Sequence, residues 1–347
     1  MRDRGWPAWV IAILLTAFYV VLYFDYKLFG RDLLSPLVQR LVPLQDPGGH
    51  PAVDKWTLYG LLYTVAVIAG GLVFMARNRR SPYHLRRTTV IMAVQLVLAF
   101  LIPSWMRLLS GKSFYFSYLW PLKIDYFYPE TIFGHGLPFA LYSFLASLVL
   151  MPLLAFFFGK RWYCSWVCGC GGLANTFGDP WRHLSSKTRW SWRLEMVTIH
   201  TVLILALVST ALVLINWGVG RQHPGFAGFA FKVQEWYGFW IGGMFSGLVG
   251  VSVYPLLGTR VWCRFGCPMA ALLGLIQRFG RYQITSQGEL CIACGNCSHY
   301  CEMGIDVRSY AMRGEPIRRA SCVGCGMCAH VCPRGVLRLQ NRATRCF

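Results

Sequence analysis

Residues 291–301 read CIACGNCSHYC, and residues 322–332 read CVGCGMCAHVC. Both runs have the spacing C-x2-C-x2-C-x3-C, which is typical of domains that bind two 4Fe–4S clusters. In such domains the first three cysteines of a run bind one cluster, and the fourth binds the other. This predicts a first ferredoxin set of Cys291, Cys294, Cys297 and Cys332, and a second ferredoxin set of Cys322, Cys325, Cys328 and Cys301.

The two runs differ directly after their last cysteine. Cys332 is followed by Pro333, as the pattern expects, whereas Cys301 is followed by Glu302. The ligand is intact, but the local turn and the potential of the second cluster are in question there. A pair of zinc ribbons is the alternative, because four cysteines also bind zinc. Two runs this tight favour iron–sulfur clusters.

The rest of the chain is apolar. Of 347 residues, 55% are hydrophobic and 14% are charged, whereas about a quarter are charged in soluble proteins. A membrane helix needs roughly 20 mostly apolar residues. This predicts six spans and a membrane-lipid environment, with the spans at residues 6–24, 58–75, 89–105, 137–158, 197–217 and 236–257.

The basic residues orient these spans. The net charge is +20, and 25 of the 34 Lys and Arg fall in the segments that lie inside if the N-terminus is inside. The positive-inside rule therefore predicts a multi-pass protein of the bacterial inner (cytoplasmic) membrane with both termini cytoplasmic. A nucleic-acid partner is not needed to explain the charge, and we expect none. All 14 cysteines fall on the inner, reducing side, where thiols stay available to metals.

An internal repeat links the spans to the cysteine runs. Residues 159–168 read GKRWYCSWVC, and residues 258–267 read GTRVWCRFGC. Both follow an apolar span and share the frame G-x-R-x-(W/Y)-C-x3-C, so we expect both at the cytoplasmic interface. The C-x3-C spacing predicts two thiols one helical turn apart on one face.

Two such pairs would supply four soft ligands, which suit an iron–sulfur cluster, zinc or Cu(I). We expect Arg161 and Arg260 to lower the pKa values of these thiols. The alternative is four buried cysteines that act as small apolar residues. Cys170 is a candidate alternative ligand, and Cys346 is interpreted as a free terminal thiol. The hypothetical third redox or metal centre is the frame set of Cys164, Cys168, Cys263 and Cys267.

The predicted fold is mostly α. It comprises a six-helix transmembrane bundle and a small C-terminal α+β domain of the bacterial two-cluster ferredoxin type. The expected divisions are a transmembrane domain at 1–258, the second frame with a connecting helix at 259–285, and the two-cluster domain at 286–347.

These motifs together resemble the membrane polyferredoxins, which include NapH-type quinol dehydrogenase subunits and the membrane half of NosR-type proteins. The resemblance extends over about residues 137–336. It implies electron transfer between the quinone pool and partner redox proteins or subunits of a respiratory complex, with quinone as a further candidate cofactor. The family's paired motif is C-x3-C-P. The second copy keeps it as Cys267-Pro268, but the first reads Cys168-Gly169-Cys170.

Two classes of function remain open from the sequence. The leading one is an electron-transfer subunit of a quinol- or quinone-linked oxidoreductase, with no catalytic residue assigned. The alternative is metal handling, copper above all, or reductase activity in the assembly of a respiratory oxidase. Cysteine thiolates suit Cu(I), so the frame set is compatible with both. No phosphate loop or Rossmann fingerprint is present in the sequence.

Overall fold

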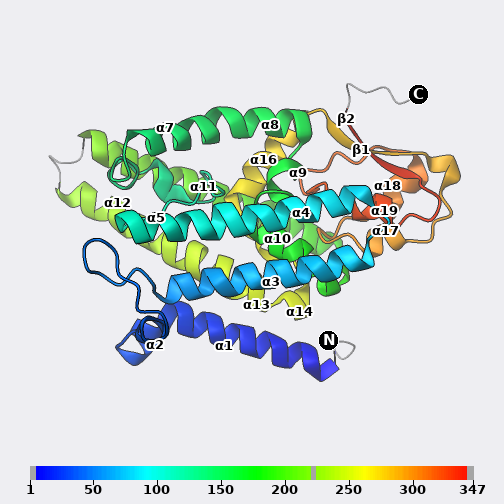
Figure 1. The fold of residues 1–347 in the computed structure, drawn as a ribbon. Coiled ribbons are helices and arrows are strands. Elements are labelled where there is room, and N and C mark those ends of the chain that lie inside the picture. Colours follow the sequence, from blue (N-terminus) through cyan, green and yellow to red (C-terminus); the bar gives the residue numbers. More distant parts are fainter. Residues whose placement is uncertain (1–4, 220–223, 342–347) are drawn as a thin grey trace.

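The computed structural model describes residues 5–219 and 224–341 and is mostly helical (Figure 1). The elements up to residue 158 are α1 (Gly5–Phe29), α2 (Leu34–Leu41), α3 (Lys55–Arg77), α4 (Pro82–Leu96), η2 (Val97–Leu101), α5 (Ile102–Ser110), η3 (Ile124–Phe127), α6 (Pro129–Phe133), α7 (Leu137–Leu145), η4 (Ala146–Leu150) and α8 (Met151–Phe158). The following elements up to residue 279 are α9 (Arg161–Cys164), α10 (Gly169–Asn175), η5 (Asp179–Leu184), α11 (Arg189–Val219), α12 (Pro224–Tyr237), η7 (Gly238–Val249), α13 (Gly250–Ser252), α14 (Tyr254–Leu257), α15 (Val261–Phe265) and α16 (Pro268–Phe279).

Among the described residues, five helices are long and apolar enough to cross a membrane, and they match the first five predicted spans. The third continues from α4 through η2 into α5, and the fourth from α7 through η4 into α8. Both contain a π-helical segment, η2 or η4, that ends just before Pro103 or Pro152. A proline lacks an N–H and crowds the carbonyl four residues earlier, which favours such a local widening. The five candidate spans are Gly5–Tyr26, Lys55–Arg77, Pro82–Ser110, Leu137–Phe158 and Arg189–Gly218.

The sixth predicted span, at residues 236–257, differs from the other five. Helices α12, η7 and α13 follow one another without a break, but η7 is a π-helix of 12 residues rich in glycine and aromatic side chains. This stretch is not among the five candidate spans of the described residues. The glycines allow close packing against α1, because a Cβ added at Gly247 would lie 2.7 Å from Cε2 of Tyr23.

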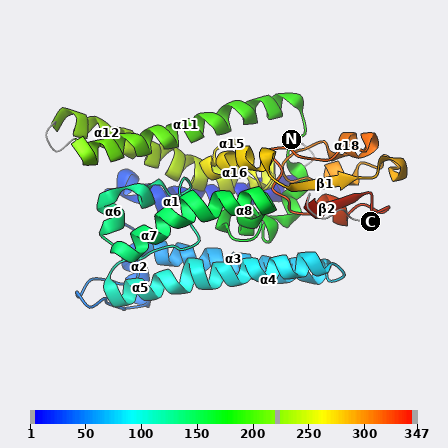
Figure 2. The ribbon, with the colours of Figure 1, turned by 90° about the horizontal axis from the view of Figure 1, so that it is seen from above.

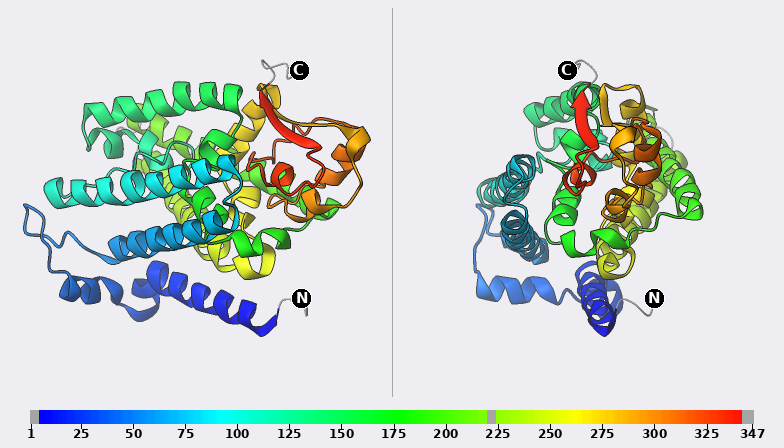
Figure 3. Two further views of the ribbon diagram at one scale, coloured as in Figure 1. Left: turned by 45° about the vertical axis from the view of Figure 1, so that its right-hand side comes forward. Right: turned by 90° about the vertical axis from the view of Figure 1, so that its right-hand side faces the viewer.

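The start of α1, the α3–α4 connection and the C-terminal elements lie at one end of the helical bundle (Figures 1 and 2). Figure 3 shows this end face-on, with the strands and short helices of the C-terminal part gathered there. The path through α12, η7 and α13 therefore returns the chain to the end at which α1 begins.

The C-terminal part contains a small antiparallel sheet. Strand β1 (Tyr282–Ser286) pairs with β2 (Leu337–Asn341), so that Tyr282 lies opposite Asn341. Strand β1 lies mostly within the stretch 259–285 that the sequence had assigned to the connecting segment. Between the strands lie η8 (Gly288–Leu290), α17 (Asn296–His299), α18 (Val307–Arg313) and α19 (Met327–His330). The pairing closes the segment with both cysteine runs into one unit of strands and short helices. Residues 342–347, and with them Cys346, lie outside the described residues.

Candidate iron–sulfur centres

The first ferredoxin set is brought together by the fold. All four of its cysteines line one hollow at the edge of the C-terminal unit, although Cys332 is distant in sequence from the other three. Cys294 is exposed to solvent, and Arg308 and Arg334 line the same hollow. The crossed ligand pattern expected from the sequence is thus compatible with the geometry of the structure.

The second ferredoxin set lies on the side that faces the helical bundle. Cys322 and Cys328 are buried. Burial, together with the neighbouring thiols of Cys325 and Cys322, raises the pKa of the Cys301 thiol to about 12. Burial raises the pKa of Cys328, and the thiols of Cys325, Cys322 and Cys301 also raise it. These interactions indicate that the Cys301 thiol lies near the cysteines of the other run.

The backbone of the two loops is adapted to turn tightly around a ligand. Gly295 and Gly326 have left-handed φ values of +80° and occupy equivalent places in the two runs. A second pair of equivalent places holds Gly324 at +62° and Ala293 at +55°, and Ala293 has the only positive φ outside glycine among the described residues. The two loops therefore share a conformation despite the difference between alanine and glycine.

The cysteines of the first ferredoxin set suit an iron–sulfur cluster because of their thiol chemistry and their arrangement around a cavity. Among residues 5–219 and 224–341, no group of three or more His, Cys, Asp or Glu is arranged to hold a single metal ion. A 4Fe–4S cube binds its four thiolates at separate corners, so its ligands stand apart around a cavity rather than converging on one point. Four cysteines lining one hollow match the cube better than a zinc site.

The two repeated frames fold alike but not on single helices. In each frame the first cysteine lies in a short helix, α9 or α15, and the second is the N-cap of the next helix, α10 or α16. Gly159 and Gly258 open the frames with positive φ values of +68° and +93°. The expectation of two thiols on one helical face is wrong, because a turn separates them.

The end of the first frame also packs against α4. A Cβ added at Gly169 would lie 3.2 Å from Oε1 of Gln95, in α4. Arg87 of the same helix donates to the carbonyl of Cys325 in the C-terminal unit. Gln95 is eight residues from Arg87, which is about 12 Å along a helix. The segment after the frame also packs closely on α3, since a Cβ at Gly70 would lie 2.4 Å from the backbone N of Phe177.

The frame set forms a buried cluster of thiols. Its four cysteines are between 4% and 7% exposed and share one core with both ferredoxin sets. Burial raises the pKa of Cys164 to about 12, and the thiols of Cys168 and Cys263 also raise it. A hydrogen bond with Cys170 lowers the pKa of Cys168 to about 7. Cys170 therefore lies beside the frame set, where a candidate alternative ligand is expected.

The arginines of the two frames have different neighbours. Nη1 of Arg260 lies 3.6 Å from Sγ of Cys263 and lowers its pKa, but burial outweighs this effect and the pKa of Cys263 is raised. Arg161 instead lies over the ring of Tyr282, with Cζ 4.5 Å from the ring centroid. The expectation that both arginines lower the thiol pKa values is thus wrong for the net effect.

Side chains from the bundle hold the loop of the second ferredoxin set. Ser165 lies in the first frame, directly after Cys164, and its Oγ donates to the carbonyl of Val323 over 2.7 Å. Nε2 of Gln277 donates to the carbonyls of Arg319 and Cys322, over 3.1 Å and 3.0 Å. The C-terminal unit is therefore docked on the membrane part by hydrogen bonds within or beside the cysteine loop.

Sequence reasoning missed a group of buried charges between these centres. Glu302 is 1% exposed and forms ion pairs with Arg260 and Arg182. Glu195, at the start of α11, pairs with Arg264 over 2.6 Å and accepts a hydrogen bond from Ser321. The glutamate after Cys301 was the one signal in the sequence, because it stands where the other run has proline.

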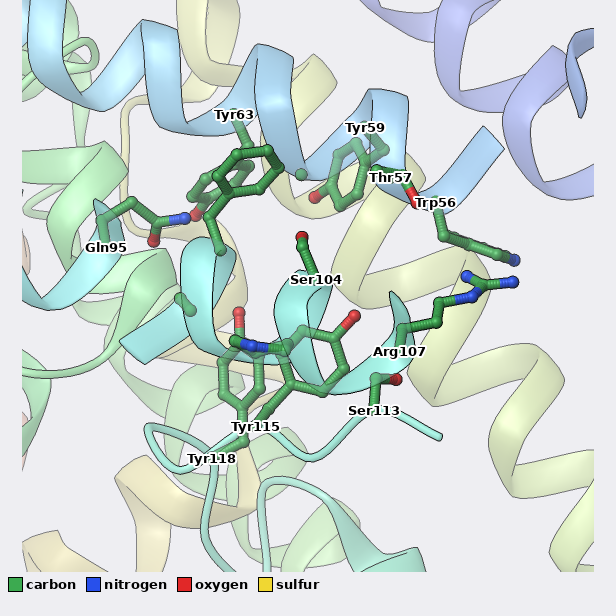
Figure 4. A pocket seen from close by; sticks show the side chains of 14 residues that line it. Trp56, Thr57, Tyr59, Tyr63, Gln95, Ser104, Arg107, Ser113, Tyr115 and Tyr118 are labelled. Atoms are coloured by element: carbon green, nitrogen blue, oxygen red, sulfur yellow. The ribbon is translucent and has the colours of Figure 1, made fainter. Parts of the chain in front are cut away.

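A cavity of about 200 Å³ lies between α3, the α4–α5 helix and the loop after α5. Figure 4 shows Tyr59, Tyr63 and Gln95 on one side of it, with Tyr115 and Tyr118 on the other. A Cβ at Gly169 would lie 3.1 Å from Oη of Tyr118. The polar floor of the cavity therefore meets the chain directly after the first frame, between Cys168 and Cys170.

Comparisons with known proteins agree with this arrangement. A 4Fe-4S dicluster domain matches residues 290–337, which contain both ferredoxin sets. A 4Fe-4S binding domain matches twice, at residues 140–190 and 238–284, and each copy contains one frame. The chain is a membrane protein of the 4Fe–4S ferredoxin type.

It is related to two proteins of this kind. The methylamine utilization ferredoxin-type protein MauN of Methylobacillus flagellatus is 29% identical over 234 residues, which are 64% of this chain and 76% of MauN. YccM of Escherichia coli (strain K12), whose name assigns it to electron transport, is 24% identical over 169 residues. That alignment covers 47% of this chain and 46% of YccM. No solved structure matches the chain.

Proposed function

We propose that this protein relays electrons between the quinone pool and partner redox proteins. It is a membrane ferredoxin-type electron transport protein. The observation that carries the proposal is the order of its three cysteine sets. The frame set is buried inside the bundle, the second ferredoxin set faces it, and the first ends at the exposed Cys294.

The proposed ligands are the twelve cysteines of the three sets. The two ferredoxin sets would each hold a 4Fe–4S cluster, and the frame set would hold a third redox centre. Such clusters supply one-electron transfer when bound. This chain's own residues exclude water from the frame set, since Cys164, Cys168 and Cys263 are all buried. Support comes from the domain matches, which place one frame in each copy.

We propose that the path through α12, η7 and α13 is the sixth membrane crossing. Arg87 reaches Cys325, and His330 lies 3.1 Å from Asn78, so the α3–α4 connection and the cysteine runs share one side. An even number of crossings must then separate the α3–α4 connection from the cysteine runs. The candidate spans after that connection number only three among the described residues, so one more is required. The basic residues of these segments support a cytoplasmic side for both termini in a bacterial inner membrane.

The cavity beside the first frame is the proposed quinone site. Its wall is aromatic, with Tyr59 and Tyr115 among the lining residues, and its floor carries the polar groups of Gln95 and Tyr118. Flat apolar head groups with two carbonyl oxygens fit such a lining, because aromatic faces bury the ring and polar donors orient the oxygens. Its floor abuts Gly169, so the head group would lie next to the frame set.

Reduction by a quinol tests this proposal. Membranes containing the protein would be mixed anaerobically with a short-chain quinol, and cluster spectra would be followed. Tyr118→Phe removes one hydroxyl from the cavity floor, and we expect a roughly fivefold slower reduction, since one hydrogen bond contributes about 1 kcal/mol. Tyr26→Phe, at an exposed tyrosine of α1, is the matched control.

The outcomes separate the two classes of function. Equal reduction rates for Tyr118→Phe and Tyr26→Phe would remove the quinone site from this cavity. Absence of exchange with quinol in the wild type, together with Cu(I) binding that Cys263→Ala abolishes, would favour metal handling over electron relay.

At the exposed end, the proposed partner is an acidic redox protein. Cys294 and the side chain of Ile292, which is 56% exposed, lie at the surface. Arg308 and Arg334 line the hollow of the first ferredoxin set. An apolar contact with a basic rim suits a partner of opposite charge, because complementary charges speed encounter.

A further inference from the structure

The carboxylate of Glu302 is buried between two arginines that come from separate parts of the chain. Its Oε1 lies 2.9 Å from Nη2 of Arg260, and its Oε2 lies 3.2 Å from Nη1 of Arg182. All three side chains are at most 1% exposed. Arg260 belongs to the second frame, whereas Arg182 lies in η5, between the first frame and α11.

Each arginine also contacts a different cysteine set. Arg260 Nη1 lies 3.6 Å from Sγ of Cys263 and 3.4 Å from the carbonyl of Cys164, both in the frame set. Arg182 Nη1 lies 3.8 Å from Sγ of Cys325, in the second ferredoxin set. One carboxylate therefore joins the two sets through two guanidinium groups.

Burial makes these charges effective. Away from water, charges a few ångströms apart interact more strongly than they do in solvent, because the effective dielectric constant is lower. Asp179 lies 3.0 Å from Arg182 and balances the second guanidinium. Breaking a buried ion pair is costly, which keeps the carboxylate of Glu302 between the two arginines.

We propose that the negative charge of Glu302, held between Arg260 and Arg182 beside the thiolates of two neighbouring centres, lowers the reduction potentials of both. The inference rests on the proposed function, because it requires a redox centre at the frame set. It also assigns a role to the glutamate at the place of the usual proline. The first ferredoxin set, which Glu302 does not contact, lies outside its influence.

The test is a redox titration followed by electron paramagnetic resonance on anaerobically purified full-length protein. Glu302→Gln keeps the shape of the side chain and removes its charge. Loss of a negative charge stabilises the reduced form, so both potentials should shift upward while the potential of the first ferredoxin set stays in place. Glu302→Asp keeps the charge and should restore values near those of the wild type. Glu315→Gln, at a half-exposed carboxylate paired with Arg313, is the matched control.

A second variant tests whether Arg182 acts on the second ferredoxin set, whose Cys325 it contacts. Arg182→Gln removes a positive charge from the second ferredoxin set, so the potential of that set should shift downward, opposite to the effect of Glu302→Gln. Upward shifts of both potentials in Glu302→Gln, together with a downward shift at the second ferredoxin set in Arg182→Gln, support the proposal. Potentials of Glu302→Gln that equal those of Glu315→Gln would overturn it.

Folding and assembly are read separately by iron content. Loss of iron in both Glu302→Gln and Glu302→Asp would overturn the potential-setting role and leave a purely structural one. The wild-type iron content and resonance signals test the proposed function by themselves. A wild type without a centre at the frame set defeats the proposed third centre, whatever the potentials of the variants.

Discussion

Gln277 connects the membrane part to the cysteine loop, and its replacement should loosen the docked unit. The side chain is 2% exposed. Its Nε2 donates to two carbonyls, those of Arg319 and Cys322, and its Oε1 accepts from the backbone N–H of Lys160 over 2.8 Å. Gln277→Leu fills a similar volume but leaves three backbone groups without this partner.

The size of the effect follows from that number of groups. Each buried polar group left without a partner costs about 1–3 kcal/mol, so the lower bound for three is about 3 kcal/mol. At 1.36 kcal/mol per factor of ten, this corresponds to roughly 150-fold easier local opening. Opening of this interface would expose the amides of residues 322–330 to solvent.

Hydrogen exchange measured by mass spectrometry reports this opening directly. We expect peptides that span residues 322–330 to exchange roughly 150-fold faster in Gln277→Leu than in the wild type. Gln287→Leu is the matched control, because the Gln287 side chain is exposed. Equal exchange in the two variants would refute the reasoning that these hydrogen bonds hold the loop.

Two further substitutions test other parts of the account. Gly171→Ala would place a Cβ 1.9 Å from the carbonyl oxygen of Cys164, so it should cost the third centre about four irons, and Gly228→Ala in open space should cost none. Retention of all irons in Gly171→Ala would contradict the close packing of the first frame. Arg308→Glu should slow electron exchange with an acidic bacterial ferredoxin and weaken its salt dependence, whereas Arg278→Glu, exposed on α16, should not. Equal rates in both variants would place the docking surface elsewhere.

The sequence predicted the cluster-binding motifs better than the contacts that surround the cysteines. Spacing alone placed Cys332 with the first run, because the pattern of such runs determines which fourth cysteine crosses over. Apolar length likewise identified the five candidate spans. These features depend on residues close together in the chain or on a repeated local pattern.

Features made by distant residues were not predictable in this way. The ion pairs of Glu302 depend on Arg182 and Arg260, which are far from it in sequence. The close packing around the first frame depends on Gly169, where a Cβ would meet Tyr118 and Gln95, and on Gly70, where it would meet the backbone of Phe177. The stretch 236–257 was predicted as an ordinary span, but residues 238–249 of it form a π-helix.

The iron and acid-labile sulfide content of anaerobically purified protein tests the central claim most directly. Three centres predict about twelve irons per chain, falling to about eight in Cys263→Ala with the ferredoxin signals retained. A wild type with about eight irons, and unchanged spectra in Cys263→Ala, would contradict a third centre at the frame set.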